Sequence, residues 1–126
     1  MAATTPLEVD QLFAKAMAAG DLEAIVGLYE PMAVVPGEPG QPAAVGPDQI
    51  REAMRPFIDL KPTDVVLAAT VVAEFDGVAI LYDDWRGTGH APDGSVVPLA
   101  GKAVEVVRRQ ADGSWKFIFD DPNARG

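Results

Sequence analysis

Residues 65–87 read VVLAATVVAEFDGVAILYDDWRG, and this stretch decides the fold class. Its two arms are rich in valine and alanine and meet at the pair Asp76-Gly77, which is typical of a tight hairpin turn. The stretch therefore predicts two antiparallel strands, one over residues 65–75 and one over residues 78–87.

Two more strands are indicated toward the C-terminus. Residues 96–110 form a long apolar run, and the turn signal at residues 112–113 separates it from a last strand over residues 114–121. The polar segment 87–95 is expected to be the loop between the hairpins. Together these segments predict an antiparallel meander that occupies the C-terminal half of the chain.

Helical patterns precede the meander. Thr5, Pro6 and Glu8 form a good helix start, and apolar residues then recur at helical spacing until Gly20. Asp21 can cap a second helix that runs through Tyr29 and stops at Pro31.

A short strand is expected over residues 32–35, a loop over residues 36–47 and a third helix over residues 47–59. Helices followed by an antiparallel meander predict an α+β domain that spans residues 1–126, with the helices on one face of the sheet.

Composition narrows the class of protein and its partners. A hydrophobic content of 48% with 23% charged residues is typical of a globular chain. The net charge of −9 disfavours nucleic acid and anionic membranes as partners, and no apolar run is long enough to span a bilayer. Because there are no cysteines and Met1–Pro6 lacks the pattern of a signal peptide, a cytoplasmic location is expected.

Several motifs carry a resemblance to a known family. Residues 20–26, GDLEAIV, followed by Leu28-Tyr29, resemble the second-helix signature of ketosteroid isomerases and SnoaL-like proteins of the nuclear transport factor 2-like superfamily. Residues 40–42, GQP, and 112–115, DGSW, resemble later segments of the same proteins. The resemblance implies a cystatin-like cone, in which a curved antiparallel sheet wraps around N-terminal helices and encloses a pocket.

The residues that the resemblance aligns with isomerase roles are mostly replaced. The oxyanion tyrosine corresponds to Phe13, the base aspartate to Gly37 and a supporting tyrosine to Met54. Only the oxyanion aspartate keeps a carboxyl group, as Glu105. Steroid isomerisation by that mechanism is therefore not expected, although Glu38, next to Gly37, is an alternative base.

Alternation along the strands indicates what fills the pocket instead. If the turn at residues 112–113 pairs Gln110 with Trp115, then Glu105 faces Asp120. The resemblance implies that Glu105 lines the cavity, so Asp120 and Asp83 are expected to point inward with it. Ionising several carboxyl groups close together in an apolar cavity costs free energy, so at least one should have a raised pKa and could act as a general acid or base. We therefore predict these three acids as catalytic residues. The predicted ligand contacts are Phe13, Met17, Met54, Phe57, Leu81, Trp85, Arg109 and Ile118.

Each of these assignments has a structural alternative. The acids can serve only in ion pairs or in bonds to loop backbone, and the apolar residues can serve only as core. Asp84 and Arg86 resemble part of the water-activating group of related epoxide hydrolases, but alternation puts them on the outer face of the sheet. His90 is the only histidine, so no metal site is predicted.

The sequence thus predicts a small-molecule pocket protein without a cofactor. The leading hypothesis is an isomerase, cyclase or hydrolase that uses carboxyl groups on an apolar substrate. The alternatives are a non-catalytic binding module and a structural cone filled by its own side chains. Since Val104, Val106, Phe117 and Phe119 are assigned to the outer face, and since relatives cover that face with a second subunit, a homodimer through the sheet is also expected.

Overall fold

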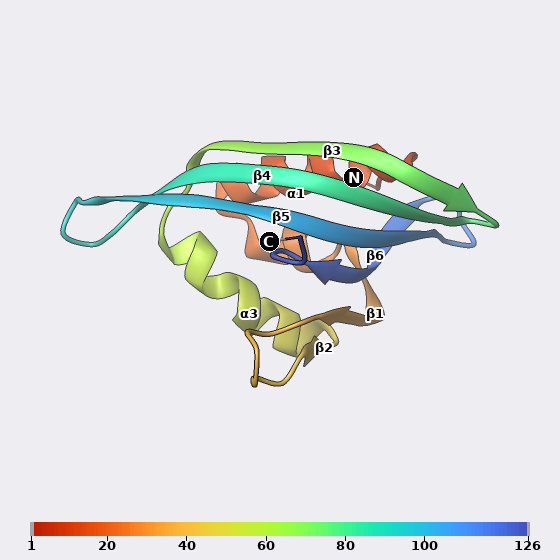
Figure 1. The fold of residues 1–126 in the computed structure, drawn as a ribbon, viewed down its shortest axis with the longest axis horizontal. Helices are drawn as coiled ribbons and strands as arrows, with labels where there is room; N and C mark the ends of the chain where they lie inside the picture. Colours follow the sequence, from red (N-terminus) through yellow and green to blue (C-terminus); the bar gives the residue numbers. More distant parts are fainter. Residues whose placement is uncertain (1, 126) are drawn as a thin grey trace.

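The computed structural model describes residues 2–125 as helices packed under a curved sheet (Figure 1). The helices are α1 (Pro6–Ala19), α2 (Leu22–Val26) and α3 (Pro47–Asp59). The strands are β1 (Tyr29–Val35), β2 (Ala44–Val45), β3 (Thr63–Phe75), β4 (Val78–His90), β5 (Val96–Arg109) and β6 (Trp115–Asp121). No helix among the described residues has the length and hydropathy needed to cross a membrane.

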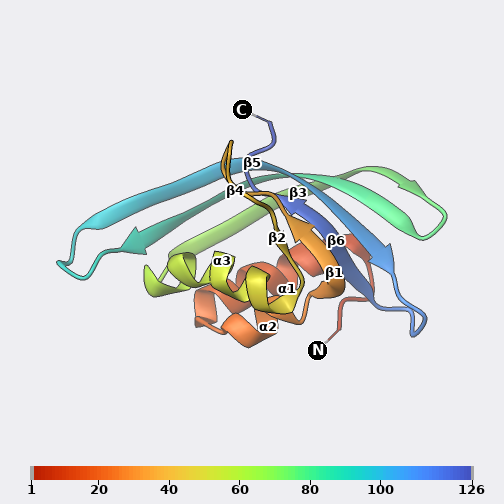
Figure 2. The same cartoon turned by 90° about the horizontal axis from the view of Figure 1, so that it is seen from below.

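The six strands form one sheet in the order β2-β1-β6-β5-β4-β3. Neighbouring strands are antiparallel except β1 and β6, which are parallel. β1 comes before the meander in the sequence and lies beside β6, the last strand of the meander. Figure 2 shows the sheet arched over the helices, all of which lie on its concave side. The predicted α+β fold, with a curved and unclosed sheet around N-terminal helices, is confirmed.

Local capping sets the ends of the first two helices. The Thr5 hydroxyl accepts from the Glu8 amide at the start of α1, and Gly20 ends the helix in the left-handed region, with φ of 69°. The Asp21 carboxylate then caps α2 at the Ala24 amide. These caps confirm the helix boundaries that the sequence predicts here.

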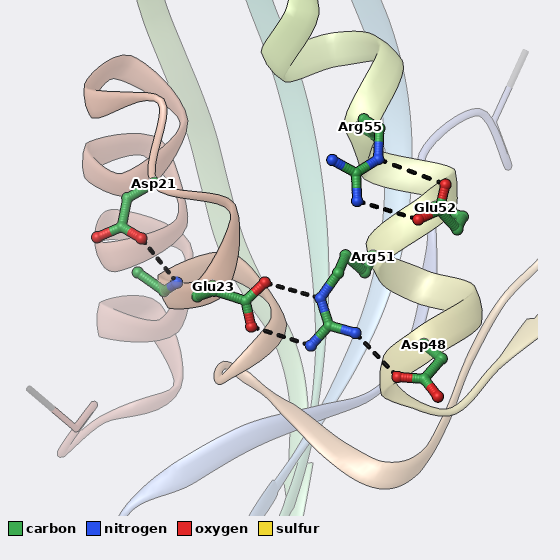
Figure 3. Close-up of polar contacts among 7 residues, drawn as sticks. Asp21, Glu23, Asp48, Arg51, Glu52 and Arg55 are labelled. Carbon is green, nitrogen blue, oxygen red and sulfur yellow. Dashed lines mark hydrogen bonds and ion pairs between the residues drawn. The ribbon is translucent and has the colours of Figure 1, made fainter.

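An arginine on α3 ties that helix to α2 (Figure 3). Arg51 binds both carboxylate oxygens of Glu23, at 2.7 and 2.9 Å, and also donates to Asp48 on its own helix. Solvent screens exposed ion pairs and leaves them little net contribution to stability, so the contact orients α3 more than it stabilises the protein. This orientation matters because Met54 and Phe57 of α3 border the cavity described below.

Three predicted boundaries are wrong. The second helix ends at Val26, and Tyr29 instead opens β1, where pairing with Phe117 of β6 replaces helical hydrogen bonds. The expected loop 36–47 contains the short strand β2. The expected loop 87–95 is mostly strand, because His90 still pairs with Val96 and only residues 91–95 form the turn.

The predicted inner face of β4 is correct. Ala79, Leu81 and Asp83 are all at most 1% exposed, whereas Ile80 and Tyr82 between them are 37% and 44% exposed. This alternation is the expected consequence of a strand with one face on the core and one turned away from it.

The predicted faces of β6 are partly wrong, because a β-bulge interrupts the strand. Arg109, not Gln110, pairs with Trp115, so the register starts one residue away from the prediction. Ile118 is then the extra residue between the pairs Val107↔Phe117 and Val106↔Phe119, which restores the predicted pairing of Glu105 with Asp120. As a result Phe117 is 1% exposed in the core, and Ile118 is not the inward residue that the sequence predicts.

Candidate functional site

A cavity of about 80 Å³ lies between the concave face of the sheet and the helices α1 and α3. Its wall includes five of the eight predicted ligand contacts: Phe13, Met17, Met54, Phe57 and Trp85. It also includes all three predicted catalytic acids: Asp83, Glu105 and Asp120. Small-molecule pockets usually measure about 300–1,000 Å³, so this space suits a compact ligand.

The other three predicted ligand contacts lie elsewhere. Leu81 is completely buried in the hydrophobic core, and Ile118 occupies the bulge of β6. Arg109 donates its amide to Gly77 beside the β3–β4 turn. Glu105 is the nearest cavity-wall residue along β5 and is four residues away, so the Arg109 backbone is roughly 13 Å from the wall, and Arg109 is not at the rim of the cavity.

Trp85 lies flat against the neighbouring strand because the residue opposite is a glycine. A Cβ on Gly101 would lie 2.5 Å from the indole ring, so no larger residue fits beneath it. The indole N–H donates to the Pro122 carbonyl at 2.8 Å, and the Phe57 ring meets the indole edge-on at a centroid distance of 6.4 Å. These contacts hold Trp85 as a fixed aromatic wall of the cavity.

The polar end of the cavity is a cluster of buried carboxyl groups, which we call the acid cluster. It consists of Asp10, Asp83, Glu105 and Asp120, each no more than 5% exposed. One oxygen from each of Asp10, Asp83 and Glu105 lies within 4.8 Å of the other two. One helix (α1) and three strands (β4, β5 and β6) thus bring together acids that are far apart in the sequence.

Asp10 is the member of the acid cluster that the sequence analysis missed. It lies on α1, behind the cavity wall, and its side chain is 1% exposed. The signal was present in the helix, because Asp10, Phe13 and Met17 recur at spacings of three and four residues and so share one face. Because that face of the helix was interpreted as entirely apolar, the carboxyl group of Asp10 was not assigned to it.

The only side-chain donor to the acid cluster from another residue type, among the described residues, is Tyr29. Its hydroxyl donates to Asp120 at 2.6 Å. Both oxygens of Asp10, one of Asp83 and one of Glu105 are buried without a hydrogen bond to any other kind of group. Such unpaired buried oxygens are costly when charged, so the acid cluster favours bound protons or a bound cation.

Burial therefore raises the pKa of every member of the acid cluster. It raises the pKa of Asp10 to about 7, partly opposed by the interaction with Glu105 and reinforced by the charges of Asp83 and Asp120. It raises the pKa of Asp120 to about 6, although the Tyr29 hydrogen bond opposes the shift. Burial also raises the pKa of Asp83, and raises that of Glu105 farthest, with the adjacent acids adding to the Glu105 shift.

The residues aligned with isomerase or hydrolase roles add no further acid/base group to the wall of the cavity among the described residues. Phe13 and Met54 line the cavity with apolar side chains, and Glu38 is exposed in the segment between β1 and β2, off the cavity wall. Asp84, considered for an epoxide hydrolase-like group, pairs with Arg125 at 2.7 Å on the outer face of the sheet. Of the described residues on the cavity wall, only the three acids offer an ordinary acid/base group.

Three acids of the cluster also have the arrangement of an oxygen-ligand metal site. Asp10, Asp83 and Glu105 can each offer one carboxylate oxygen. Magnesium and calcium need about six or more oxygen ligands in total, so the remainder would have to be water or ligand atoms in the cavity.

Comparison with known proteins identifies the chain's relatives. The family model for the SnoaL-like domain matches residues 9–118. A ketosteroid isomerase-like protein from Erwinia carotovora atroseptica is 26% identical, with a TM-score of 0.76 over 90% of this chain and 88% of that one. A search of the curated proteins found no match.

Two further solved structures share the fold at lower identity. An NTF2-like protein with a cystatin-like fold from Novosphingobium aromaticivorans is 18% identical, with a TM-score of 0.71 over 90% of this chain and 75% of that one. A protein from Catenulispora acidiphila in complex with S-DNPA is 19% identical, with a TM-score of 0.69 over 90% and 86%.

Proposed function

The chain belongs to the SnoaL-like domain family, and on that premise we propose that its cavity binds a compact, largely apolar molecule on which the acid cluster performs acid/base chemistry. The observation that carries the proposal is the position of Asp120, a carboxyl group on an apolar cavity wall with its pKa raised to about 6. A general acid or base works best when its pKa lies near the working pH.

Two carboxyl groups take different roles in this proposal. Asp120 is the group that exchanges a proton with the substrate, because Tyr29 donates to one of its oxygens and stabilises its ionised form. Glu105 has the pKa raised farthest and stays protonated, so it acts as a hydrogen-bond donor to the substrate. The charge of Asp83 contributes to the raised pKa values of both groups.

The apolar part of the wall would bind the body of the substrate. Trp85 and Phe57 offer fixed aromatic surfaces, while Met17 and Met54 are flexible and can adjust to its shape. A ligand bound to a protein of this fold, S-DNPA in the Catenulispora protein, is consistent with a binding role. The isomerase, cyclase and hydrolase classes named above all fit such a site.

The pKa values of the acid cluster test this proposal directly. We expect carboxyl-detected NMR titration to show Asp120 ionising near pH 6 and Asp10 near pH 7. Asp112 is the internal control, since hydrogen bonds from Ser114 lower the pKa of that exposed carboxyl. Ordinary pKa values throughout the cluster would contradict the acid/base role.

A second pair of variants separates an enzyme from a binding module. Once a ligand is identified by co-purification, Asp120→Asn should abolish turnover while the apolar part of the wall still binds the ligand, because the amide keeps the shape but not the proton exchange. Asp121→Asn, which alters the neighbouring residue outside the cavity wall, is the matched control. Tight binding without turnover in the unaltered protein would favour the non-catalytic alternative.

We also propose that two copies associate through the convex face of the sheet. Four apolar side chains that are 36% to 46% exposed lie in β3 and β4: Val66, Val72, Ile80 and Tyr82. Arg125 lies over the Tyr82 ring at 4.5 Å and pairs with Asp84, so the C-terminal segment supplies polar groups on the same face. Apolar patches of this kind commonly mark an interface.

Sedimentation equilibrium should therefore find a dimer, and Ile80→Lys should weaken it by at least about tenfold in dissociation constant because a charge enters the apolar contact. Leu7→Lys is the control, since Leu7 is similarly exposed, at 39%, but lies on α1 on the opposite side of the sheet. A monomer at all concentrations would refute the proposed association.

A further inference from the structure

The charge of the cavity restricts what it can bind. The acidic side chains on its wall are Asp83, Glu105 and Asp120, with Asp10 directly behind them. Arg86 also borders the cavity, but alternation with Trp85 turns its side chain toward the opposite face, where it is exposed. Four carboxyl groups are therefore gathered at the cavity with no basic side chain paired with them among the described residues.

Apart from protons that the carboxyl groups share with one another, the unpaired oxygens have no donor within residues 2–125. Asp10 is 1% exposed, and within these residues neither of its oxygens accepts a hydrogen bond from the backbone or from another kind of side chain. One oxygen each of Asp83 and Glu105 is in the same state. Buried polar atoms nearly always have a hydrogen-bond partner. A ligand with N–H donors and a positive charge would supply the hydrogen bonds that these oxygens lack and would balance their negative charge.

The aromatic residues of the cavity favour the same kind of ligand. Trp85 donates its only N–H to the Pro122 carbonyl, so its ring can offer a ligand only an apolar surface and a π face. The Phe57 ring stands perpendicular to it, with an interplanar angle of 89°, and Phe13 lies on another part of the wall. Aromatic faces attract organic cations, most strongly where water is excluded.

We propose that the ligand of this cavity is a small organic amine, with its ammonium group against Asp83, Glu105 and Asp120 and its apolar body against Trp85 and Phe57. This inference rests on the proposed function, because it uses the same cavity and specifies the charge of the molecule that enters it. The net charge of −9 adds a long-range field that attracts such cations.

An amine fits these residues better than a metal ion does. Beyond the acid cluster, none of the described wall residues has a side chain with a neutral oxygen that could help to complete an octahedral shell. An ammonium group needs only about three acceptors, which the wall carboxyl groups provide. Its apolar body also gives the aromatic surfaces a role.

Binding of an amine must displace protons from the acid cluster. The groups that face the ammonium position are Asp10 on α1, Tyr29 on β1, Asp83 on β4, Glu105 on β5 and Asp120 on β6, with Asp84, Asp121 and Arg125 acting on them through space. Because burial raises the carboxyl pKa values, the protonated acids compete with the amine at low pH. Affinity for the amine should therefore increase from about pH 5 to about pH 8, where an alkylamine is still charged.

Three molecules of the same shape provide the test. Cyclohexylamine, cyclohexanol and cyclohexanecarboxylate differ only in the charge of one substituent, and their binding to the full chain can be followed by NMR and calorimetry. We expect cyclohexylamine to bind at least about tenfold more tightly than cyclohexanol, with proton release, and the carboxylate not to bind. Asp83→Asn should remove most of the preference for the amine while leaving cyclohexanol binding within about twofold.

The outcomes distinguish this inference from the proposed function. If cyclohexanol binds as tightly as cyclohexylamine, the amine proposal is wrong and the proposed apolar pocket stands. If none of the three binds, both are contradicted. If manganese chloride alone binds at Asp83 and Glu105 and excludes cyclohexylamine, the acid cluster is a metal site and the amine proposal is again wrong.

Discussion

Replacing Phe117 with alanine is expected to lower the free energy of unfolding by about 3 to 5 kcal/mol, the usual cost of removing a buried phenylalanine ring. The side chain is 1% exposed and stands edge-on to the Phe13 ring at a centroid distance of 6.1 Å. It also packs on the Tyr29 ring at 4.9 Å. Urea denaturation followed by circular dichroism measures the loss.

The neighbouring residue provides a matched control for this prediction. Ile118 is the extra residue of the β6 bulge and is only half-buried, so Ile118→Ala should cost about 1 kcal/mol. Uninterrupted alternation from the predicted turn would reverse the two results, because it places Ile118 inward and Phe117 outward. A larger loss for Ile118→Ala would therefore contradict the bulge.

Raising the pH from about 5 to about 8 is expected to destabilise the protein by at least about 4 kcal/mol. The cause is the acid cluster, since burial raises the pKa of Asp10 from 3.8 to about 7 and that of Asp120 to about 6, and raises the pKa of Glu105 farther still. Between the unfolded and folded pKa values the folded protein holds protons that the unfolded chain has released. Their contribution to stability is complete below the unfolded pKa, near 4, and is lost as the pH rises through the folded values.

A neutral side chain at position 10 should remove part of this dependence. In Asp10→Asn we expect the slope of unfolding free energy against pH to fall, because Asp10 no longer has to ionise in the core, while the other members of the acid cluster keep their contributions. Asp112→Asn is the control, since the Ser114 hydrogen bonds lower the pKa of Asp112, which therefore does not titrate in this window. Stability that is constant or increases from pH 5 to pH 8 would contradict the acid cluster as described.

Much of the fold follows from local patterns along the chain. Thr5, Gly20 and Asp21 set helix ends through their own capping contacts, which depend on residues no more than about four positions away. The turn at Asp76-Gly77 and the alternation along β4 correctly predict the strand and the residues that share a face with Asp83, and the family resemblance correctly implied that this face is the inner one. The family resemblance supplied the cone, which the SnoaL-like match confirms.

The candidate site was less predictable because its geometry depends on distant segments. The acids Asp83, Glu105 and Asp120 were chosen correctly as cavity-lining residues, but the pairing of Glu105 with Asp120 followed from two errors that cancelled. The turn register was off by one residue, and the bulge at Ile118 shifted it back. Simple alternation contains no signal for a bulge, which is stabilised by the packing of Phe117 under the sheet.

The sequence by itself determined the order of the elements and which residues share a face of β4, and the family resemblance implied which of those faces lines the pocket. Only the tertiary structure decided that Asp10 joins those acids, that Arg109 lies far from them and that Trp85 rests on Gly101. The physical reason is the range of the interactions. Periodicity and caps act between neighbours in the chain, whereas burial and charge act between whichever groups the fold brings together, and these set the chemistry of the cavity.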